Sequence, residues 1–520
     1  MKRKETRIIT ILSAVVFTLA FLLSSRLWFR LDLTRNKAYT ISEVSRNLYR
    51  EISDQVTITY FVSDRLMIAH PMPGEIADLL REYASFSRGR IRFIQRDPAK
   101  AELLRRVEEL GIVPQQIQVV EKNESTVATV YTGILIEYLD REAIIPVVFS
   151  LDTLEYDLSS RIRSLIRNTE RELGVIVGDA HKQWSAEYGL LNRELILSGF
   201  KIRQIQMGDE IPDTLPALLV LGGAEDLDEN SQWFLDRYIM AGGRVLFALD
   251  GVFVDTLGSL EARSVQDMGL LAMLANYGVV LRRVLVLDQT ALNLTFQMQS
   301  GNGTIIRSTR YPEWIGVQEQ RSNPGHPVTS RFGGLDLYWA SPLELMPPPG
   351  ISAESLFTST EDAWLQTENF ITNPNLISQF GNEADQTRGE KILGASLSGI
   401  FPSAFEAGSF QAKPSRIIVV GDADFAGNFM QVNRGEGRNL DFLVRAVEWL
   451  SSDDDIIAIR NRDVSQGRLD RITDRDKRDT VMAFSRNINT IVMPLAIIIT
   501  GLILGLRRKA KTGNFLKNQE

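Results

Sequence analysis

Both ends of this 520-residue chain carry an apolar segment with positive charges on its outer side, and this pattern constrains the architecture most strongly. Residues 8–23 (IITILSAVVFTLAFLL) contain no charge and follow a basic cluster in residues 2–7. Residues 491–506 (IVMPLAIIITGLILGL) precede the basic run 507–511. With residues 487–490 the second segment reaches about 20 residues, the length that crosses a bilayer. The sequence therefore predicts two membrane-spanning helices.

Positive charge at both outer ends places both termini in the cytoplasm. The prediction is a two-pass protein of the bacterial cytoplasmic (inner) membrane, held in the lipid bilayer by two helices, with a large periplasmic or extracellular ectodomain. The first helix and its tail occupy 1–30, the second helix 489–507, and a basic tail 508–520. A cleaved signal peptide is the alternative for the first segment. The aromatic pair Trp28–Phe29 favours an uncleaved helix, because such rings anchor at the membrane interface.

The charge distribution separates the ends from the middle of the chain. The whole chain carries −7, the first seven residues carry +3 and residues 507–520 carry +4, so the 499 residues between them carry −14. Such an acidic ectodomain argues against a nucleic-acid partner. The absence of cysteine excludes disulfides, iron–sulfur clusters and thiol nucleophiles. With only three histidines, far apart in sequence, we predict neither a metal site nor a cofactor.

Residues 31–150 are predicted to form a first ectodomain with the order β-α-β-α-β-β. Thr40 or Ser42 caps a first helix that ends near Glu51. The expected strands are 56–62, 90–95, 116–122 and 133–149, the last bent at Asp140-Arg141. The two later helices are expected at 74–87 and about 98–110. This topology resembles the thioredoxin-like fold. Because the chain has no cysteine, the resemblance implies a surface module without redox chemistry.

Residues 151–460 show apolar runs that end in glycine or acid and alternate with helical patterns. This alternation predicts a doubly wound α/β sheet. The expected strands begin the segments 173–182, 201–207, 216–226, 242–251, 280–288 and 415–425, and the expected helices cover about 158–168, 186–198, 229–241 and 439–450. Residues 291–414, rich in Gly, Pro, Ser and Asn, are predicted to be an irregular insertion with strands. Residues 461–488 are predicted to form a charged juxtamembrane segment, either solvated or docked on a partner protein in the membrane.

Acidic residues follow several of these strands, and ligands of open α/β sheets bind at the carboxyl ends of the strands. The candidate crevice residues are Asp179, His181, Glu225, Asp226, Asp250, Asp422 and Asp424. One interpretation is a hydrolase or a metal site, with His181 as base or ligand. The other is structural, because Asp caps helices and Gly permits tight turns. Since no G-x-S-x-G serine and no thiol is present, we assign no catalytic residue and interpret the crevice as a ligand or partner surface.

Several separated segments, in order, resemble one family. They are RLDLTRNKAYTIS (30–42), GGAEDLDENSQWFLDRYIMAGGRVLFALD (222–250), HPVTSRFGGLDLYWASPLEL (326–345), GIFPSAF (399–405), RIIVVGDADF (416–425) and INTIVMPLAIIITGLILGLRRK (488–509). The chain is similar to the auxiliary component of ABC transporters of the gliding-motility (Gld) type. The resemblance implies an extracytoplasmic accessory subunit beside an ABC permease and its ATPase. It also implies a second ectodomain that is similar to class I glutamine amidotransferases without their nucleophile.

These observations predict a non-enzymatic, membrane-anchored auxiliary subunit that couples the permease to a substrate or to an envelope partner. The chain carries no G-x-x-x-x-G-K-[ST] motif, so it is not itself the ATPase. Two alternatives stay open, namely an envelope hydrolase and a tethered solute-binding protein, each using the acidic rim of the second ectodomain.

Overall fold

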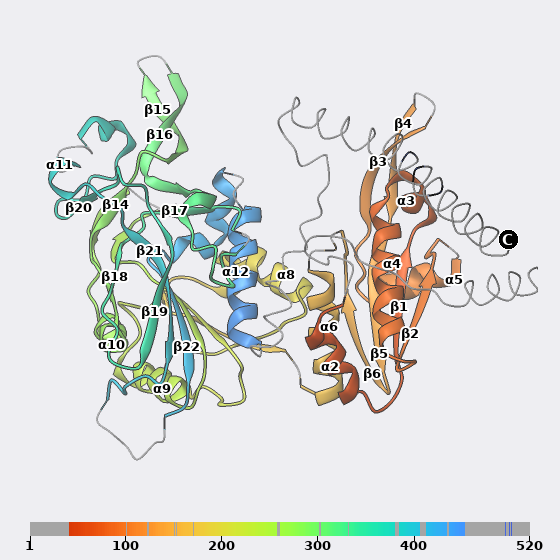
Figure 1. The fold of residues 1–520 in the computed structure, drawn as a ribbon. Coiled ribbons are helices and arrows are strands. Elements are labelled where there is room, and N and C mark those ends of the chain that lie inside the picture. The colour runs from red at the N-terminus through yellow and green to blue at the C-terminus, as the bar shows by residue number, and fades with distance from the viewer. Residues whose placement is uncertain are drawn as a thin grey trace, which may run out of the picture. The chain divides into compact units, whose positions relative to one another are not determined.

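The computed structural model describes residues 41–452, apart from short gaps, together with Leu495, Ile499 and Gly501. The gaps are 100, 122–123, 150, 152, 170, 257–259, 301–302, 331, 380–383, 406–411 and 434–435. Apart from these three residues, the two predicted membrane helices, the juxtamembrane segment and the tails lie outside the described residues. Within the described part, no helix combines the length and apolar character needed to span a bilayer. The described chain is a mixed α/β structure (Figure 1).

The first sheet has four strands in the order β2-β1-β5-β6. Its strands are β1 (Val56–Val62), β2 (Ile91–Arg96), β5 (Thr132–Tyr138) and β6 (Arg141–Ile145). Strands β1 and β2 are parallel, whereas β5 is antiparallel to both β1 and β6. The helices of this part are α2 (Glu43–Glu51), α3 (Asp64–Ala69), α4 (Met72–Phe86), α5 (Ala101–Glu109) and α6 (Leu154–Arg167).

The two faces of this sheet bury different helices because successive strand side chains point to opposite sides. Ile58 and Tyr60 of β1 share a core with α2, α4 and α6. Phe61 instead packs with Val107 of α5. Helix α2 begins as predicted, since the Ser42 side chain accepts a hydrogen bond from the amide of Ser45.

One expected strand of this part is wrong, and another is present but pairs outside the main sheet. Residues 133–149 are not one bent strand, because the chain reverses after β5 and returns as the antiparallel β6. Leu139 takes a left-handed conformation with φ of 55°, which allows this tight turn. The expected strand 116–122 is β3 (Gln115–Glu121), which pairs with the unpredicted β4 (Glu124–Val130) in a separate hairpin. It therefore lies outside the four-stranded sheet.

The second sheet has nine strands, arranged as β13-β18-β21-β22-β10-β9-β7-β8 with β19 also on β21. Their bounds are β7 (Glu172–Val177), β8 (Lys201–Gln204), β9 (Leu218–Leu221), β10 (Val245–Ala248), β13 (Val279–Leu281), β18 (Leu343–Leu345), β19 (Ile351–Thr358), β21 (Ile392–Gly399) and β22 (Ser415–Val420). The five strands from β8 to β22 are parallel. The four others pair antiparallel.

Helices cover both faces of the parallel strands. Leu219, Leu246 and Ile418 point to a core that includes α7 (Trp184–Glu187), α8 (Gly189–Leu197) and α12 (Glu436–Ser451). The alternate strand residues Leu218 and Phe247 point to a core with α9 (Glu229–Met240) and α10 (Leu270–Tyr277). This alternation is why the parallel strands are apolar along their whole length.

Smaller sheets complete the second part. They comprise β11 (Val252–Val254) with β12 (Ala262–Ser264), β14 (Leu285–Leu287) with β20 (Trp364–Gln366), and β15 (Ala291–Ser300) with β16 (Gly303–Val317) and β17 (Leu335–Tyr338). The short helices are η1 (Glu319–Arg321), η2 (Pro374–Gln379), α11 (Ala384–Thr387), η3 (Asp424–Ala426) and η4 (Asn428–Asn433). The expected single strand 280–288 is wrong, because its residues belong to β13 and β14 in different sheets. The residues of the expected insertion supply β18, β19 and β21 to the large sheet.

Candidate functional site

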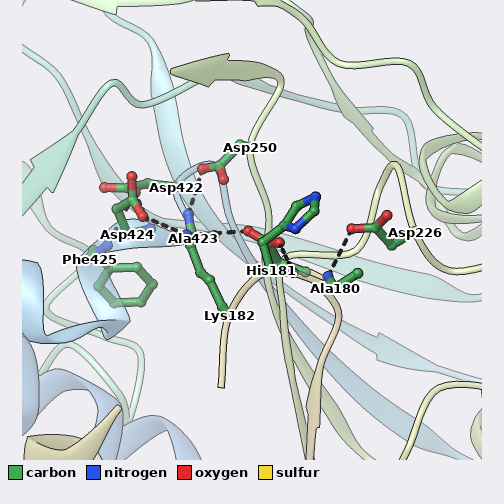
Figure 2. A network of polar contacts seen from close by, with 10 residues as sticks. Ala180, His181, Lys182, Asp226, Asp250, Asp422, Ala423, Asp424 and Phe425 are labelled. Atoms are coloured by element: carbon green, nitrogen blue, oxygen red, sulfur yellow. Dashed lines mark hydrogen bonds and ion pairs between the residues drawn. The ribbon is translucent and has the colours of Figure 1, made fainter. Parts of the chain in front are cut away.

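The candidate residues follow β7, β9, β10 and β22, four adjacent parallel strands of the second sheet. Parallel strands end at the same edge, so the segments that follow them meet there. Figure 2 shows this edge, with Asp422 and Asp424 near Asp250, and with His181 between that group and Asp226. The order of strands thus brings together residues that are up to 245 positions apart in the chain.

Asp422 is fully buried and serves the turn after β22. One carboxylate oxygen accepts hydrogen bonds from the amides of Asp424 (2.8 Å) and Phe425 (3.2 Å). The other accepts from the amide of Tyr338 in β17 at 2.6 Å. Burial and the nearby carboxylates of Asp250 and Asp424 raise its pKa well above the ordinary value, against the effect of these amides. Asp422 therefore joins β22 to β17 from inside the protein.

Lys182 is the cation that balances this group of carboxylates, and sequence reasoning missed it. Its Nζ lies 2.9 Å from Oδ1 of Asp424 and 3.8 Å from Oδ2 of Asp179. Burial opposes its charge, but the attraction of Asp424 and Asp250 outweighs burial, so the pKa of Lys182 is raised. Lys182 follows His181 directly, so the signal was present in the sequence as a cation within an acidic rim.

Asp250 lies close to this ion pair without bonding to it. Its carboxylate accepts a hydrogen bond from the amide of Ala423 at 2.7 Å. Burial and the charge of Asp424 raise its pKa to about 7, although Lys182 acts in the opposite direction. Both the protonated and the ionised form of the Asp250 carboxyl are therefore populated near neutral pH.

The remaining candidates hold neighbouring loops. Asp226 accepts a hydrogen bond from the amide of Ala180 at 3.0 Å. Glu225 binds Arg263 through two contacts and accepts from the amide of Gln266, and the hydrogen bond to Arg263 is the main reason that its pKa is lowered.

His181 contributes its backbone amide to Asp179 Oδ1 at 2.8 Å. Its ring is exposed and makes no hydrogen bond or ion pair to another described residue. The ring therefore has no partner among the described residues to orient it as a general base.

A cavity of about 150 Å³ opens at this edge. Its lining contains Asp179, His181, Lys182, Gly222, Gly223, Ala224, Glu225, Asp226, Asp250, Phe253, Arg263 and Val265. Asp422 and Asp424 are absent from that lining. The loop backbones approach closely here, since a Cβ added at Gly178 would lie 2.6 Å from the carbonyl oxygen of Gly222.

Four carboxylates, two cations and one imidazole thus face a small polar cavity. Among the residues that the structure describes, no three His, Asp or Glu side chains are arranged to hold a metal ion. The carboxylates mainly accept hydrogen bonds from backbone amides, and the amides that donate to Asp226, Asp250 and Glu225 belong to neighbouring loops. The arrangement can offer hydrogen bonds and charge to a polar ligand or a partner loop.

Comparison with known proteins gives a family match that covers more than half of the chain. Residues 170–446 match the family model described as "ABC-type uncharacterized transport system". Residues 35–137 match a domain of unknown function, DUF7088. An uncharacterized protein of Borreliella burgdorferi strain B31 is 25% identical over 523 residues, which covers 98% of this chain and 99% of that protein.

Two solved structures show a distant similarity. The N-terminal domain of mmIFT52 has a TM-score of 0.31 and 13% identity, and the match covers 54% of this chain and 98% of that one. A ThuA-like protein of Parabacteroides merdae has a TM-score of 0.27 and 13% identity, with 55% of this chain and 91% of that one covered.

Proposed function

Because this chain belongs to the ABC-type uncharacterized transport system family, we propose that it is a membrane-anchored, extracytoplasmic auxiliary subunit of an ABC transporter complex. The match over residues 170–446 is the observation that carries this proposal. A relative aligned over almost its whole length supports a common architecture that includes both ends of the chain. The partners are an ABC permease and its ATPase, in a complex of the gliding-motility type.

The proposed localisation is the bacterial inner membrane, with both termini cytoplasmic and the two α/β parts outside. The apolar segments and their flanking cations support this topology. The chain offers a direct test because it contains no cysteine. A membrane-impermeant maleimide should label Ser308→Cys, at an exposed position of β16, in intact spheroplasts. It should label Thr512→Cys only after permeabilisation, and the opposite result would reverse the topology.

The two ectodomains are proposed to be a thioredoxin-like module and an amidotransferase-like module. The first idea is supported by the β1–β2 parallel pair joined to the β5–β6 hairpin on the other edge of β1. The second is supported by five adjacent parallel strands with helices on both faces. Without cysteine the first module has no thiol chemistry and acts as a surface.

The acidic crevice is proposed to bind a ligand or a partner without catalysing a reaction. Asp422 is buried and accepts hydrogen bonds from three backbone amides, and Glu225 forms an ion pair with Arg263. Both carboxylates therefore hold segments of the fold together. In this proposal the ectodomain passes conformational change between the permease and a substrate or envelope partner.

The competing candidate is an envelope hydrolase or a tethered solute-binding protein at the same crevice. The cavity of about 150 Å³ and the Asp250 carboxyl, whose pKa is near 7, favour it. Hydrolysis of envelope glycan or peptide that is lost in a folded Asp250→Asn variant would support the hydrolase. Tight binding of a small solute, without turnover, would support the solute-binding protein.

Co-purification tests the proposed function. A tagged full-length chain extracted from native membranes in mild detergent should bring down an ABC permease and an ATPase. Truncation at residue 488, which removes the second apolar segment, should lose both. Recovery of the chain alone, while other ABC transporters in the same extract stay intact, would contradict the proposal.

A further inference from the structure

A second cavity, whose lining shares no residue with that of the acidic crevice, is lined by cations. Its volume is about 410 Å³. The lining residues come from β6, α6, β8 and the adjoining loops, and they are Arg141, Glu142, Ala143, Ile144, Arg161, Ser164, Leu165, Asn168, Thr169, Arg171, Gly199 and Lys201. Four cationic side chains thus face this space beside one carboxylate, in a chain whose ectodomain is strongly acidic overall.

Arg161 is a buried residue of the cavity lining, and its side chain is only 5% exposed. Its Nε donates to the carbonyl of Ile144 at 3.0 Å, and its Nη2 lies 3.3 Å from the carbonyl oxygen of Ser198. Asp157 lies 3.2 Å away and provides one countercharge. Burial lowers the pKa of Arg161, Asp157 opposes this, and the neighbouring charge of Arg171 lowers the pKa further. The two guanidinium groups therefore repel each other across the site.

Two guanidinium nitrogens at the cavity have no hydrogen-bond partner among the described residues. Nη2 of Arg171 and Nη1 of Arg141 are buried, and neither makes a hydrogen bond to another described residue. Arg171 is fixed in place by the carbonyl of Ser198 (3.1 Å) and by the ring of Phe200, 4.2 Å from its guanidinium carbon. Leaving a buried donor unsatisfied costs about 1–3 kcal/mol, and more when it is charged. An acceptor in the cavity would remove that cost.

The carboxylates nearby are already engaged. Glu142 lies 3.4 Å from Arg106, and Glu172 lies 3.9 Å from both Lys201 and Arg203. The acid beside Arg141 is Asp140, which is 4.0 Å away and 94% exposed, so water screens it. Lys201 therefore has Glu172 as a countercharge and Arg161 has Asp157, so the donors left for a ligand are those of Arg171 and Arg141.

From this geometry we propose that the cationic cavity is an anion-binding site for the phosphate group of a small phosphorylated molecule. A phosphate monoester carries a charge of about −1.5 to −2 and three strong acceptor oxygens, which suits several converging donors better than a single carboxylate does. The volume of 410 Å³ lies within the range of about 300–1,000 Å³ that small-ligand sites occupy. The phosphate belongs either to a soluble ester or to a lipid headgroup.

Calorimetric titration of the full-length chain, purified in a zwitterionic detergent, tests the proposal. The probes are inorganic phosphate, glycerol 3-phosphate and a short-chain phosphatidic acid, each at matched ionic strength. We expect saturable binding tighter than about 1 mM for at least one probe. Preference for glycerol 3-phosphate assigns the soluble source, and preference for phosphatidic acid assigns the lipid source. Absence of saturable binding by all three probes overturns the proposal.

Variants locate the site. Arg171→Gln and Arg141→Gln should each weaken binding by at least about tenfold, because each removes a charged hydrogen-bond donor. The matched control is Arg203→Gln, which changes an arginine of β8 that is 51% exposed and absent from the cavity lining. It should bind as the wild type does. Undiminished binding by both folded cavity variants, or an equal loss in Arg203→Gln, overturns the assignment. Arg161 is left unchanged because its backbone contacts make it structural.

Discussion

Replacing Lys182 by methionine tests whether the acidic crevice depends on a single cation. Methionine keeps much of the length of the side chain and removes the charge together with the hydrogen bond that Nζ donates to Asp424. The change would leave Asp424 and Asp179 without the ammonium group that lies 2.9 and 3.8 Å from them. It would also raise the pKa of Asp250 further, because Lys182 is the charge that lowers it. The variant should therefore be less stable at neutral pH.

The exposure of the pair sets the expected magnitude. The side chains of Lys182 and Asp424 are 29% and 20% exposed, so the pair is neither fully buried nor a surface pair. Breaking a buried pair costs about 3–5 kcal/mol, and surface pairs contribute about 0–1 kcal/mol. We expect Lys182→Met to lower the free energy of unfolding by about 2 kcal/mol. Tryptophan fluorescence during urea denaturation reports it, since buried Trp184 stacks on Tyr188 just after Lys182.

A double-mutant cycle with Asp424→Asn isolates the interaction from other effects of the substitution. The coupling free energy should be about 1–2 kcal/mol, so Asp424→Asn should cost much less when Lys182 is already methionine. Lys413→Met, at an exposed lysine of the same part of the chain, is the control and should be close to neutral. A coupling free energy below about 0.3 kcal/mol would refute the reasoning.

Three further predictions concern single positions. The pKa of Asp250 is raised from 3.8 to about 7, so the stability that its protonated form contributes is present below pH 3.8 and is lost as pH rises to 7. In urea titrations at pH 8, Asp250→Asn should therefore be more stable than the wild type by about 1–3 kcal/mol. Near pH 4 the variant should show no gain in stability. Burial lowers the pKa of His326 from 6.5 to about 4, so the stability contributed by its neutral form is complete above pH 6.5 and is lost as pH falls to 4. His326→Gln should reduce the fall in the free energy of unfolding over this pH range by up to about 3 kcal/mol. An unchanged fall would contradict this prediction. A Cβ at Gly421 would lie 1.9 Å from the carbonyl oxygen of Ser341, so Gly421→Ala should lower the free energy of unfolding by more than about 3 kcal/mol, as thermal unfolding would show. The control Gly437→Ala should not destabilise the protein, because a Cβ there would have no neighbour within 4 Å.

The sequence predicts best those elements that are determined by their own residues. The cap at Ser42 depends on residues within one helical turn, and the structure has it. The apolar runs that end in acid predicted the parallel strands, because a strand covered on both faces is apolar throughout. Their shared edge then predicted that Asp250, Asp422 and Asp424 would lie together, as they do.

Pairing between distant segments was harder to predict. Strand β21 lies beside β22 but antiparallel to it, and no local pattern in its sequence encodes that neighbour or direction. The turn between β5 and β6 lacks the glycine that usually marks a two-residue hairpin, so its sequence favours a bend within one strand. Lys182 and Asp424 are 242 positions apart, and their ion pair follows only from the strand order.

Cross-linking in intact native membranes tests the proposed membership of an ABC transporter complex most directly, because it requires no detergent. An amine-reactive cross-linker that enters cells can couple the lysines near the second apolar segment, Lys477, Lys509, Lys511 and Lys517, to their neighbours. The account predicts mass-spectrometric cross-links from these lysines to an ABC permease or its ATPase. Cross-links only within this chain, while other permeases in the same sample are linked to their own ATPases, would contradict it.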